Sequence, residues 1–256
     1  HMGLRMVLDM KRAFQLIILV ALQLPFLAFS QMLPLRKVSL IYHGPGTCEQ
    51  CPEAIATALE KEGFKTVFVF PGQLTKANFA KADLYVQPGG TDNIDETLNA
   101  LSFDEILNLR SFIAKGGRYL GICAGGYLAG QYSDENHMHK AFGLLPHMSI
   151  DEELEDSDAT LMPVQWGSQR RTMYYQSGPS FGSTATANTL VVARYAGSGH
   201  IAAQISPYGK GFVGVIGPHP EADEDWYEDD DLSTKQGLNF DLLHQFTSQL
   251  FANPKK

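Results

Sequence analysis

Short apolar runs alternate with amphipathic stretches through the first half of the chain. The runs are compact and rich in β-branched and aromatic residues, which predicts buried strands. These strands are expected at 38–42, 66–70, 82–87 and 119–122. Apolar residues recur at helical spacing from Pro52 to Gly63 and over 103–115, which predicts two helices. Because strands and helices alternate, we expect an α/β protein with a mostly parallel central sheet.

The second half of the chain has a different pattern. Strand-like runs follow one another there with short turns rich in Gly, Ser and Pro, which predicts an antiparallel extension of the sheet. These runs lie at 173–175, 190–195, 201–205 and 212–216. An amphipathic helix is expected over 238–251. No repeat or linker follows residue 31, so we expect one domain over residues 31–256.

The first 30 residues have a composition of their own. The first two resemble a cloning scar, and Lys11 and Arg12 then precede an uncharged apolar run at 13–29. The run ends in Ala-Phe-Ser at 28–30, which fits the small-x-small rule of signal peptidase. We therefore expect a secretory signal peptide over 1–30 and a periplasmic or secreted protein with no stable membrane span after cleavage. An uncleaved membrane anchor and a buried N-terminal helix are the alternatives.

Composition narrows the classes of protein. Hydrophobic residues make up 44% of the chain, which is enough to bury a substantial core. Twenty Lys and Arg against 28 Asp and Glu give a net charge of -8, which opposes nonspecific binding to a phosphate backbone. Nucleic acid is therefore not an expected partner. Three cysteines are too few for a disulfide scaffold, and their odd number leaves at least one unpaired within the chain.

A candidate nucleophile stands at the end of the fourth predicted strand. Cys123 lies inside GICAGG, residues 121–126. A nucleophile on a sharp strand-to-helix turn needs small residues two positions before and after it, and a helix N-terminus favours the thiolate. The motif predicts a nucleophile elbow, although a buried structural cysteine in a glycine-rich turn fits the same pattern.

Two further motifs complete a catalytic set. PGG at 88–90 ends a predicted strand and offers backbone N–H groups, together with the amide of Ala124, to a developing oxyanion. GPHPE at 217–221 follows the last predicted strand. Its His219 is suited to activate the thiol and its Glu221 to orient the imidazole.

These motifs, in this order, resemble the class I glutamine amidotransferase-like superfamily, and most closely the biotin-protein ligase N-terminal-domain family. The closer resemblance rests on YHGPG at 42–46, QPGGTD at 87–92, GGRYLGICAGGYLAG at 116–130 and YQSGPSF at 175–181. It covers residues 37–250 and implies a flavodoxin-like α/β fold, a three-layer sandwich whose sheet carries the antiparallel extension.

The resemblance also implies roles for single residues. Cys123 would be the nucleophile, His219 the base and Glu221 the orienting acid, and the amides of Gly90 and Ala124 would form the oxyanion hole. We further assign three candidate substrate-binding residues, which are Gly89, Tyr127 and Tyr42.

Two departures from the superfamily shape the functional expectation. Glutamine amidotransferases usually carry Gln at the position of Tyr127, where it helps to hold the substrate. No synthase or biotin ligase catalytic domain follows in these 256 residues, so we expect neither ammonia supply to a synthase nor biotin ligation. We expect an exported Cys-His-Glu hydrolase that attacks an amide of a small molecule or peptide through a thioester, without a cofactor. A noncatalytic binding module that keeps the fold is the alternative.

Cys48 and Cys51 form a Cys-x-x-Cys motif at the start of the first predicted helix. In an oxidising compartment the pair would form a short structural disulfide, which we favour. It could instead be a redox pair, or a switch that engages Cys123, and the chain would then be a thiol redox protein.

Other clusters are weighed against simpler explanations. The histidines at 137, 139 and 147 match no metal template, and the acidic blocks at 151–158 and 221–231 lack the loop of a calcium site, so we expect no metal. The second block directly follows the candidate base, which predicts an acidic mouth that disfavours anionic substrates. Four aromatic residues could line a pocket, although core packing is commoner for strand aromatics. They are Trp166, Tyr174, Tyr175 and Phe181.

Overall fold

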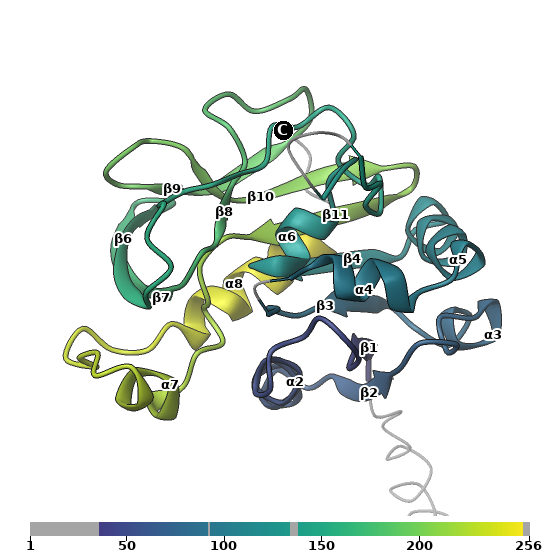
Figure 1. The fold of residues 1–256 in the computed structure, drawn as a ribbon, viewed down its shortest axis with the longest axis horizontal. Helices are drawn as coiled ribbons and strands as arrows, with labels where there is room; N and C mark the ends of the chain where they lie inside the picture. The colour runs from purple at the N-terminus through teal and green to yellow at the C-terminus, as the bar shows by residue number, and fades with distance from the viewer. Residues whose placement is uncertain (1–35, 92, 134–137, 253–256) are drawn as a thin grey trace, which may run out of the picture. The chain divides into compact units, whose positions relative to one another are not determined.

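One mixed sheet organises the chain (Figure 1). The computed structural model describes residues 36–91, 93–133 and 138–252. Nine strands of this described part form the sheet, in the order β2 (Lys65–Val69), β1 (Val38–Tyr42), β3 (Leu84–Gln87), β4 (Arg118–Ile122), β11 (Gly211–Ile216), β10 (Ile201–Tyr208), β9 (Leu190–Tyr195), β6 (Thr160–Trp166) and β7 (Gln169–Tyr175). Two short strands, β5 (Asp151–Glu152) and β8 (Pro179–Ser180), pair separately.

The sheet divides into a parallel and an antiparallel half. The strands β2, β1, β3, β4 and β11 are parallel to their neighbours, in the order typical of flavodoxin-like folds. From β11 onward every pairing is antiparallel. The predicted α/β fold with an antiparallel extension is confirmed, and the extension contributes four of the nine strands.

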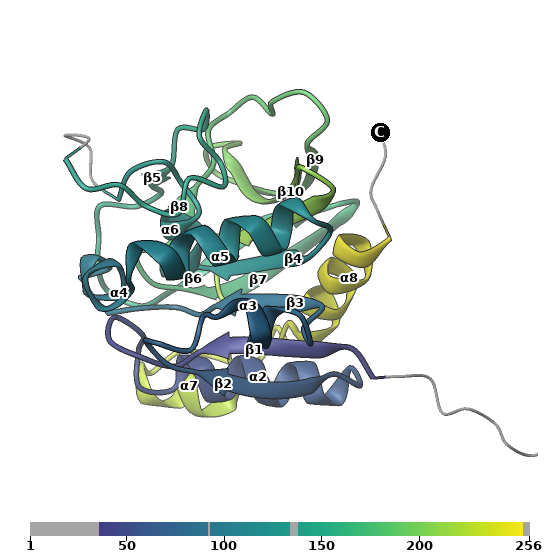
Figure 2. The same ribbon diagram turned by 90° about the vertical axis from the view of Figure 1, so that its right-hand side faces the viewer.

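Helices cover both faces of the parallel half, which gives the predicted three layers (Figure 2). On one face lie α2 (Cys51–Lys61) and α8 (Phe240–Phe251). On the other lie α3 (Lys76–Phe79), α5 (Phe103–Ala114) and α6 (Ala124–Leu128). Two six-residue helices, α4 (Asp95–Ala100) and α7 (Glu224–Asp229), follow β3 and β11 in the chain.

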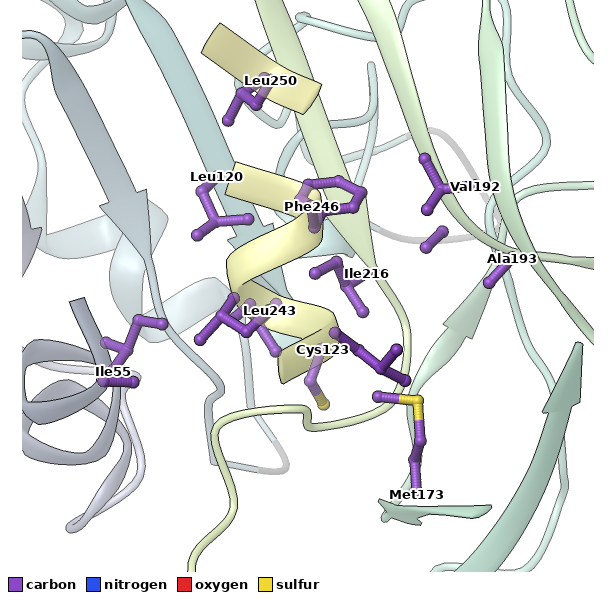
Figure 3. Packing of buried hydrophobic residues seen from close by; sticks show 14 of the residues in the cluster. Ile55, Leu120, Cys123, Met173, Val192, Ala193, Ile216, Leu243, Phe246 and Leu250 are labelled. Carbon is purple, nitrogen blue, oxygen red and sulfur yellow. The ribbon is translucent and has the colours of Figure 1, made fainter. Parts of the chain in front are cut away.

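The core under α8 reaches the end of β4. Figure 3 shows Phe246 and Leu250 of α8 packed beside Leu120 and Ile216, with Cys123 at the margin of the same cluster. Full burial of one such large apolar side chain contributes about 1.5–3 kcal/mol. The candidate nucleophile is therefore attached to a densely packed part of the protein.

Local sequence signals explain the boundaries of α2 and α5, which lie on opposite faces of the sheet. Pro52 stands in the first turn of α2, and Gly63, with φ of 95°, follows its last turn. Ser102 caps α5 in a capping box, in which its side chain accepts from the N–H of Glu105 and the Glu105 carboxylate accepts from the N–H of Ser102. Both boundaries agree with the sequence pattern to within two residues.

The described residues include most of the predicted domain and none of the predicted signal peptide. Residues Lys37–Lys256 form one compact unit. The predicted signal peptide at 1–30 lies outside the described residues, as does His137. In the part of the chain that is described, no helix has the length and apolar character needed to cross a membrane.

Candidate active site

Cys123 occupies a sharp turn between β4 and α6. Its backbone has φ of 50° and ψ of -109°, a region that side-chain-bearing residues rarely adopt. Holding such a residue there costs on the order of 1–3 kcal/mol. The Cys123 N–H donates to the Ile216 carbonyl of β11 at 2.9 Å, and the N–H of Gly126 donates to the Cys123 carbonyl at 2.8 Å. These bonds fix the strained conformation at both ends.

The small residues of GICAGG are required by close backbone contacts. A Cβ at Gly125 would lie 2.0 Å from the Gln87 carbonyl oxygen. A Cβ at Gly121 would lie 2.3 Å from the Gly125 carbonyl oxygen, and one at Gly126 would lie 2.9 Å from the Phe181 ring. The elbow is therefore wedged between β3 and the segment that contains Phe181, as its small residues predict.

Cys123, His219 and Glu221 lie together at the carboxyl ends of the adjacent strands β4 and β11. The thiol of Cys123 and the imidazole of His219 are in hydrogen-bond contact. Glu221 holds the imidazole at Nδ1, which lies 2.9 Å from Glu221 Oε1. The three residues are 8%, 4% and 1% exposed, so the whole line of contacts is buried. This is the spatial order that nucleophile, base and orienting acid require.

The buried charges govern the protonation of His219. Burial by itself lowers the pKa of the imidazole, but the charges of Glu221 and Cys123 and the hydrogen bonds to both raise it, with a net rise to about 10. Among the described residues Glu221 Oε2 has no hydrogen-bond partner, so His219 is the group that compensates this carboxylate. An imidazolium beside the sulfur is therefore the favoured state at neutral pH.

Gly90 and Ala124 are adjacent. A Cβ at Gly90 would lie 2.6 Å from the Ala124 Cβ and 2.6 Å from the Gly46 carbonyl oxygen. Among the described residues neither the Gly90 nor the Ala124 N–H has an acceptor. Two unclaimed donors beside the elbow are what an oxyanion hole needs.

Cys48 and Cys51 form a disulfide, with an S–S distance of 1.92 Å. Cys123 is the free cysteine. The bonded pair lies at the start of α2, and Cys51 packs in an apolar cluster with Tyr174 and Trp226. The pair therefore lies beside the candidate site.

An acidic cleft of about 390 Å³ opens between α2 and α7. Its lining includes the carboxylates of Glu53, Asp223, Asp225, Glu228 and Asp229. Trp226 also lines the cleft, and its ring lies 5.2 Å from that of His219. The acidic block thus lies next to the candidate base, where the sequence places it.

Comparison with known proteins agrees with the observed fold. The family profile described as biotin-protein ligase, N terminal, matches residues 37–140. No curated protein matches the chain. A solved glutamine amidotransferase is 14% identical with a TM-score of 0.56, over 72% of this chain and 90% of that one. The chain has the fold of the class I glutamine amidotransferases.

Two further amidotransferase-like structures support the same fold. A glutamine amidotransferase from Thermotoga maritima is 15% identical with a TM-score of 0.52, over 85% of this chain and 93% of that one. A putative GMP synthase protein from Thermoplasma acidophilum is 16% identical with a TM-score of 0.51, over 85% of this chain and 98% of that one. The predicted resemblance to the superfamily, with a biotin-protein ligase N-terminal match, is confirmed.

Tyr127 connects α6 to the loop at residues 176–178. Its hydroxyl donates to the Ser177 carbonyl at 3.0 Å, and burial is the main reason that its pKa is strongly raised. Ser177 itself has φ of 47°, and the neighbouring Gln176 carbonyl lies 3.5 Å from Cys123 Sγ. Tyr127 therefore ties a strained loop over the thiol.

The remaining predicted substrate residues differ in placement. Gly89 contacts His219, because a Cβ there would lie 2.8 Å from His219 Cε1. Tyr42 is fully buried in the core on the α5 side, and its hydroxyl donates to the Pro45 carbonyl at 3.1 Å. Its burial raises its pKa to about 12. Tyr42 thus supports the loop that begins at His43, without an exposed surface for a ligand.

Of the four aromatic residues considered for a pocket, Tyr174 lies against the candidate base. Its ring meets that of His219 edge-on at 5.7 Å, and its carbonyl accepts from the His219 N–H at 2.9 Å. Trp166 instead packs against Phe246 in the core. Trp226, whose ring contacts those of both His219 and Tyr174, was not expected from the sequence, although its place five residues after Glu221 offered a signal.

Proposed function

We propose that this chain is a cysteine-dependent hydrolase that attacks an amide or related acyl carbon through Cys123. The observation that supports this most directly is the buried line of contacts from the strained Cys123 through His219 to Glu221. A structural cysteine would need neither the positive φ nor a charged imidazole beside its sulfur. The positive φ costs free energy, and both such strain and a strongly shifted pKa are typical of functional sites.

The chemistry follows from the positions of these groups. Cys123 Sγ forms a bond to the acyl carbon, and the charge on the carbonyl oxygen is accepted by the amides of Gly90 and Ala124. His219 gives its proton to the departing amine as the carbon–nitrogen bond breaks, which leaves a thioester. Water then gives a proton to His219 and its hydroxyl to the acyl carbon. The carbon–sulfur bond breaks, which releases a carboxylic acid and restores the Cys123 thiolate beside the His219 imidazolium. Glu221 keeps Nδ1 of His219 oriented and stabilises the imidazolium.

The substrate we propose is an amide of a small molecule or peptide that is uncharged or cationic near the reacting carbon. The acidic cleft beside Trp226 supports this choice, because its carboxylates repel anions. Nucleic acid is not a proposed partner of a chain with a net charge of -8.

Labelling of Cys123 by an electrophilic thiol probe tests the proposal. We expect iodoacetamide to modify Cys123 in the wild type, with loss of labelling in Cys123→Ala and slower labelling in His219→Asn. A screen of amide-bearing small molecules and cell-wall peptides, with Cys123→Ala as control, would then identify a substrate. Equal labelling of wild type and Cys123→Ala would overturn the proposal.

A noncatalytic binding module is the second candidate. It is favoured by the small exposure of Cys123 and by the Tyr127 bond that holds the loop over it. This alternative predicts ligand binding that persists in Cys123→Ala, without turnover in the wild type.

We also propose export of the protein. The uncharged run at 13–29 and the Cys48–Cys51 disulfide both support an oxidising compartment. Fractionation of the producing cells and N-terminal sequencing test this, with a mature start at Gln31 as the expected result. Recovery of uncleaved protein from the cytoplasm would contradict it.

A further inference from the structure

The Cys48–Cys51 disulfide packs directly against the backbone of the PGG loop and is next to the candidate base. A Cβ at Gly89 would lie 2.8 Å from Cys51 Sγ and 2.8 Å from His219 Cε1. The sulfur and the imidazole therefore both crowd the one position that a Gly89 Cβ would take, and no room is left there for a methyl group. Any displacement of Cys51 Sγ toward Gly89 must move Gly89 or His219.

A second set of contacts connects the disulfide loop to the candidate oxyanion hole. The Cys48 N–H donates to the Gly89 carbonyl at 3.2 Å, and the Thr91 N–H donates to the Gly46 carbonyl at 3.1 Å. These two bonds lie on either side of Gly90 in the chain, and Gly90 itself pairs with Thr47. A Cβ at Gly90 would collide with both Gly46 and Ala124. The loop that carries Cys48 thus fixes the position of the Gly90 amide.

The two sulfurs differ in access. Cys51 is 2% exposed, whereas Cys48 is only partly buried. A thiolate from solvent therefore reaches the sulfur of Cys48 first, and Cys51 is the leaving thiolate. Since Cys51 belongs to the same apolar cluster as Tyr174 and Trp226, whose rings both contact His219, its release occurs inside the wall of the site.

We propose that the Cys48–Cys51 disulfide is a redox-sensitive positioning element that holds Gly89, Gly90 and His219 in their reactive arrangement. This inference rests on the proposed function of Cys123. Reduction uses an external dithiol, which forms a mixed disulfide with Cys48 and then closes to its own disulfide. Two electrons and two protons pass to the protein, which leaves Cys48 and Cys51 as free thiols.

Reduction changes the geometry because the sulfurs must separate. A covalent S–S distance of about 2 Å is replaced by a non-bonded contact of about 3.5–4 Å. One side of Cys51 Sγ is closed by Gly89 and His219, so the separation is taken up by the loop that begins at His43 or by the PGG loop. Loss of the short cross-link also increases the freedom of that loop.

Two measurements on the full chain test the inference. The samples are oxidised wild type, wild type reduced with dithiothreitol, and the double variant Cys48→Ser/Cys51→Ser. The first measurement is amide hydrogen exchange of residues 43–51 and 87–91, with the central strand at residues 201–208 as the internal control for an intact fold. The second is the pH profile of Cys123 alkylation by iodoacetamide, read from the Cys123 peptide after removal of the reductant.

We expect exchange at 43–51 and 87–91 to rise about tenfold or more on reduction and in the double variant, with 201–208 unchanged. We expect the pH profile of alkylation to shift in both, and reoxidation to restore it in the wild type only. Dithiothreitol should change neither property of the double variant. Unchanged exchange and an unchanged pH profile on reduction would overturn the inference.

The outcomes separate this inference from the proposed function. If Cys123 resists alkylation in every redox state, the nucleophile proposal and the inference that rests on it both fail. If Cys123 reacts with the same pH profile in oxidised and reduced protein, the inference fails while the proposed function stands. A loss of protection that includes 201–208 would indicate global unfolding and would likewise contradict a positioning role.

Discussion

The protonation of His219 depends on two acidic neighbours. Burial disfavours the imidazolium, yet Glu221 and Cys123 together outweigh this and raise the pKa of His219. A raised pKa in the folded state means that the imidazolium stabilises the fold. This contribution is fully present below the unfolded-state pKa of about 6.5 and is lost as the pH rises through about 10.

Replacement of the orienting acid should therefore lower the pKa of His219. In Glu221→Gln the carboxylate charge is gone while the side chain keeps its size, so we expect the titration midpoint of His219 to fall by about one unit or more. Alkylation of Cys123 near neutral pH should slow as the imidazolium is lost. NMR titration of the His219 ring and the pH profile of iodoacetamide labelling measure the two effects.

A matched control for this change is Glu228→Gln. This variant removes a carboxylate that lines the acidic cleft and has no hydrogen bond to His219. It should leave the midpoint close to that of the wild type. Equal midpoints in Glu221→Gln and wild type would mean that Glu221 does not set the charge state of His219.

Close backbone contacts leave no space for a larger residue at Gly125, in the turn from β4 to α6. Gly125→Ala places a methyl group 2.0 Å from the Gln87 carbonyl oxygen, and neither backbone can move without disturbing β3 or the elbow. We expect a loss of at least about 1–3 kcal/mol in the free energy of unfolding. Urea denaturation measures it.

Gly197→Ala is the comparison for that loss. No atom lies within 4 Å of the added methyl group at Gly197, and its φ is not in the positive range. It should be neutral or stabilise by about 0.4–1 kcal/mol. Similar stabilities of the Gly125 and Gly197 variants would refute the tight elbow.

The Tyr127 hydroxyl of α6 holds the loop at residues 176–178 in place over Cys123. Tyr127→Phe removes the hydrogen bond to the Ser177 carbonyl, a bond worth about 0.5–1.5 kcal/mol. Because Ser177 is also strained, we expect the loop to open more often and Cys123 alkylation to accelerate severalfold. Mass spectrometry of the labelled peptide gives the rate.

Tyr208→Phe serves as the reference for that experiment. It removes the hydroxyl that accepts from Arg110 at 3.1 Å and therefore also costs one hydrogen bond. Its alkylation rate should equal that of the wild type. A Tyr127→Phe rate no faster than that of Tyr208→Phe would show that the loop does not limit access to Cys123.

Most elements could be predicted from periodicity, and β6 shows where that method stops. β6 contains Pro163, which lacks an N–H and argues against a strand in sequence. In the structure Pro163 pairs with Thr172 of β7, and the pairing with β9 begins only at Val164. The missing donor therefore falls outside the β9 pairing, a fact that depends on the register and not on the local sequence.

The meeting of Cys123, His219 and Glu221 could be predicted from the sequence because these residues stand in motifs at strand ends. The aromatic residues around His219 could not be predicted in the same way. Tyr174 comes from the antiparallel half and Trp226 from α7, and their meeting at His219 depends on how β7 and the segment after β11 pass one another. The packing of Cys51 against Gly89 is of the same kind, because the Cys-x-x-Cys motif alone does not indicate its neighbours.

The charge of the whole molecule bears on which ligands reach Cys123. The net charge of -8 is concentrated in part at the cleft between α2 and α7. Glu53 is paired with His43 at 2.7 Å, and Asp223 caps α7, so neither is a clean target for substitution. Asp225 and Glu228 line the same cleft and can be neutralised without loss of a cap.

The double variant Asp225→Asn/Glu228→Gln should favour anionic reagents. Iodoacetate and iodoacetamide attack the same thiol, but only iodoacetate is charged. The rate with iodoacetate divided by the rate with iodoacetamide therefore reports the local electrostatic potential. We expect this ratio to rise roughly twofold to fivefold at low salt, and the rise to fade near 1 M salt as the charges are screened. Glu60→Gln, at the far end of α2 from the cleft, should leave the ratio unchanged. A ratio that is insensitive to the cleft carboxylates would mean that the cleft does not act on the path to Cys123, and the expected discrimination against anionic substrates would then be wrong.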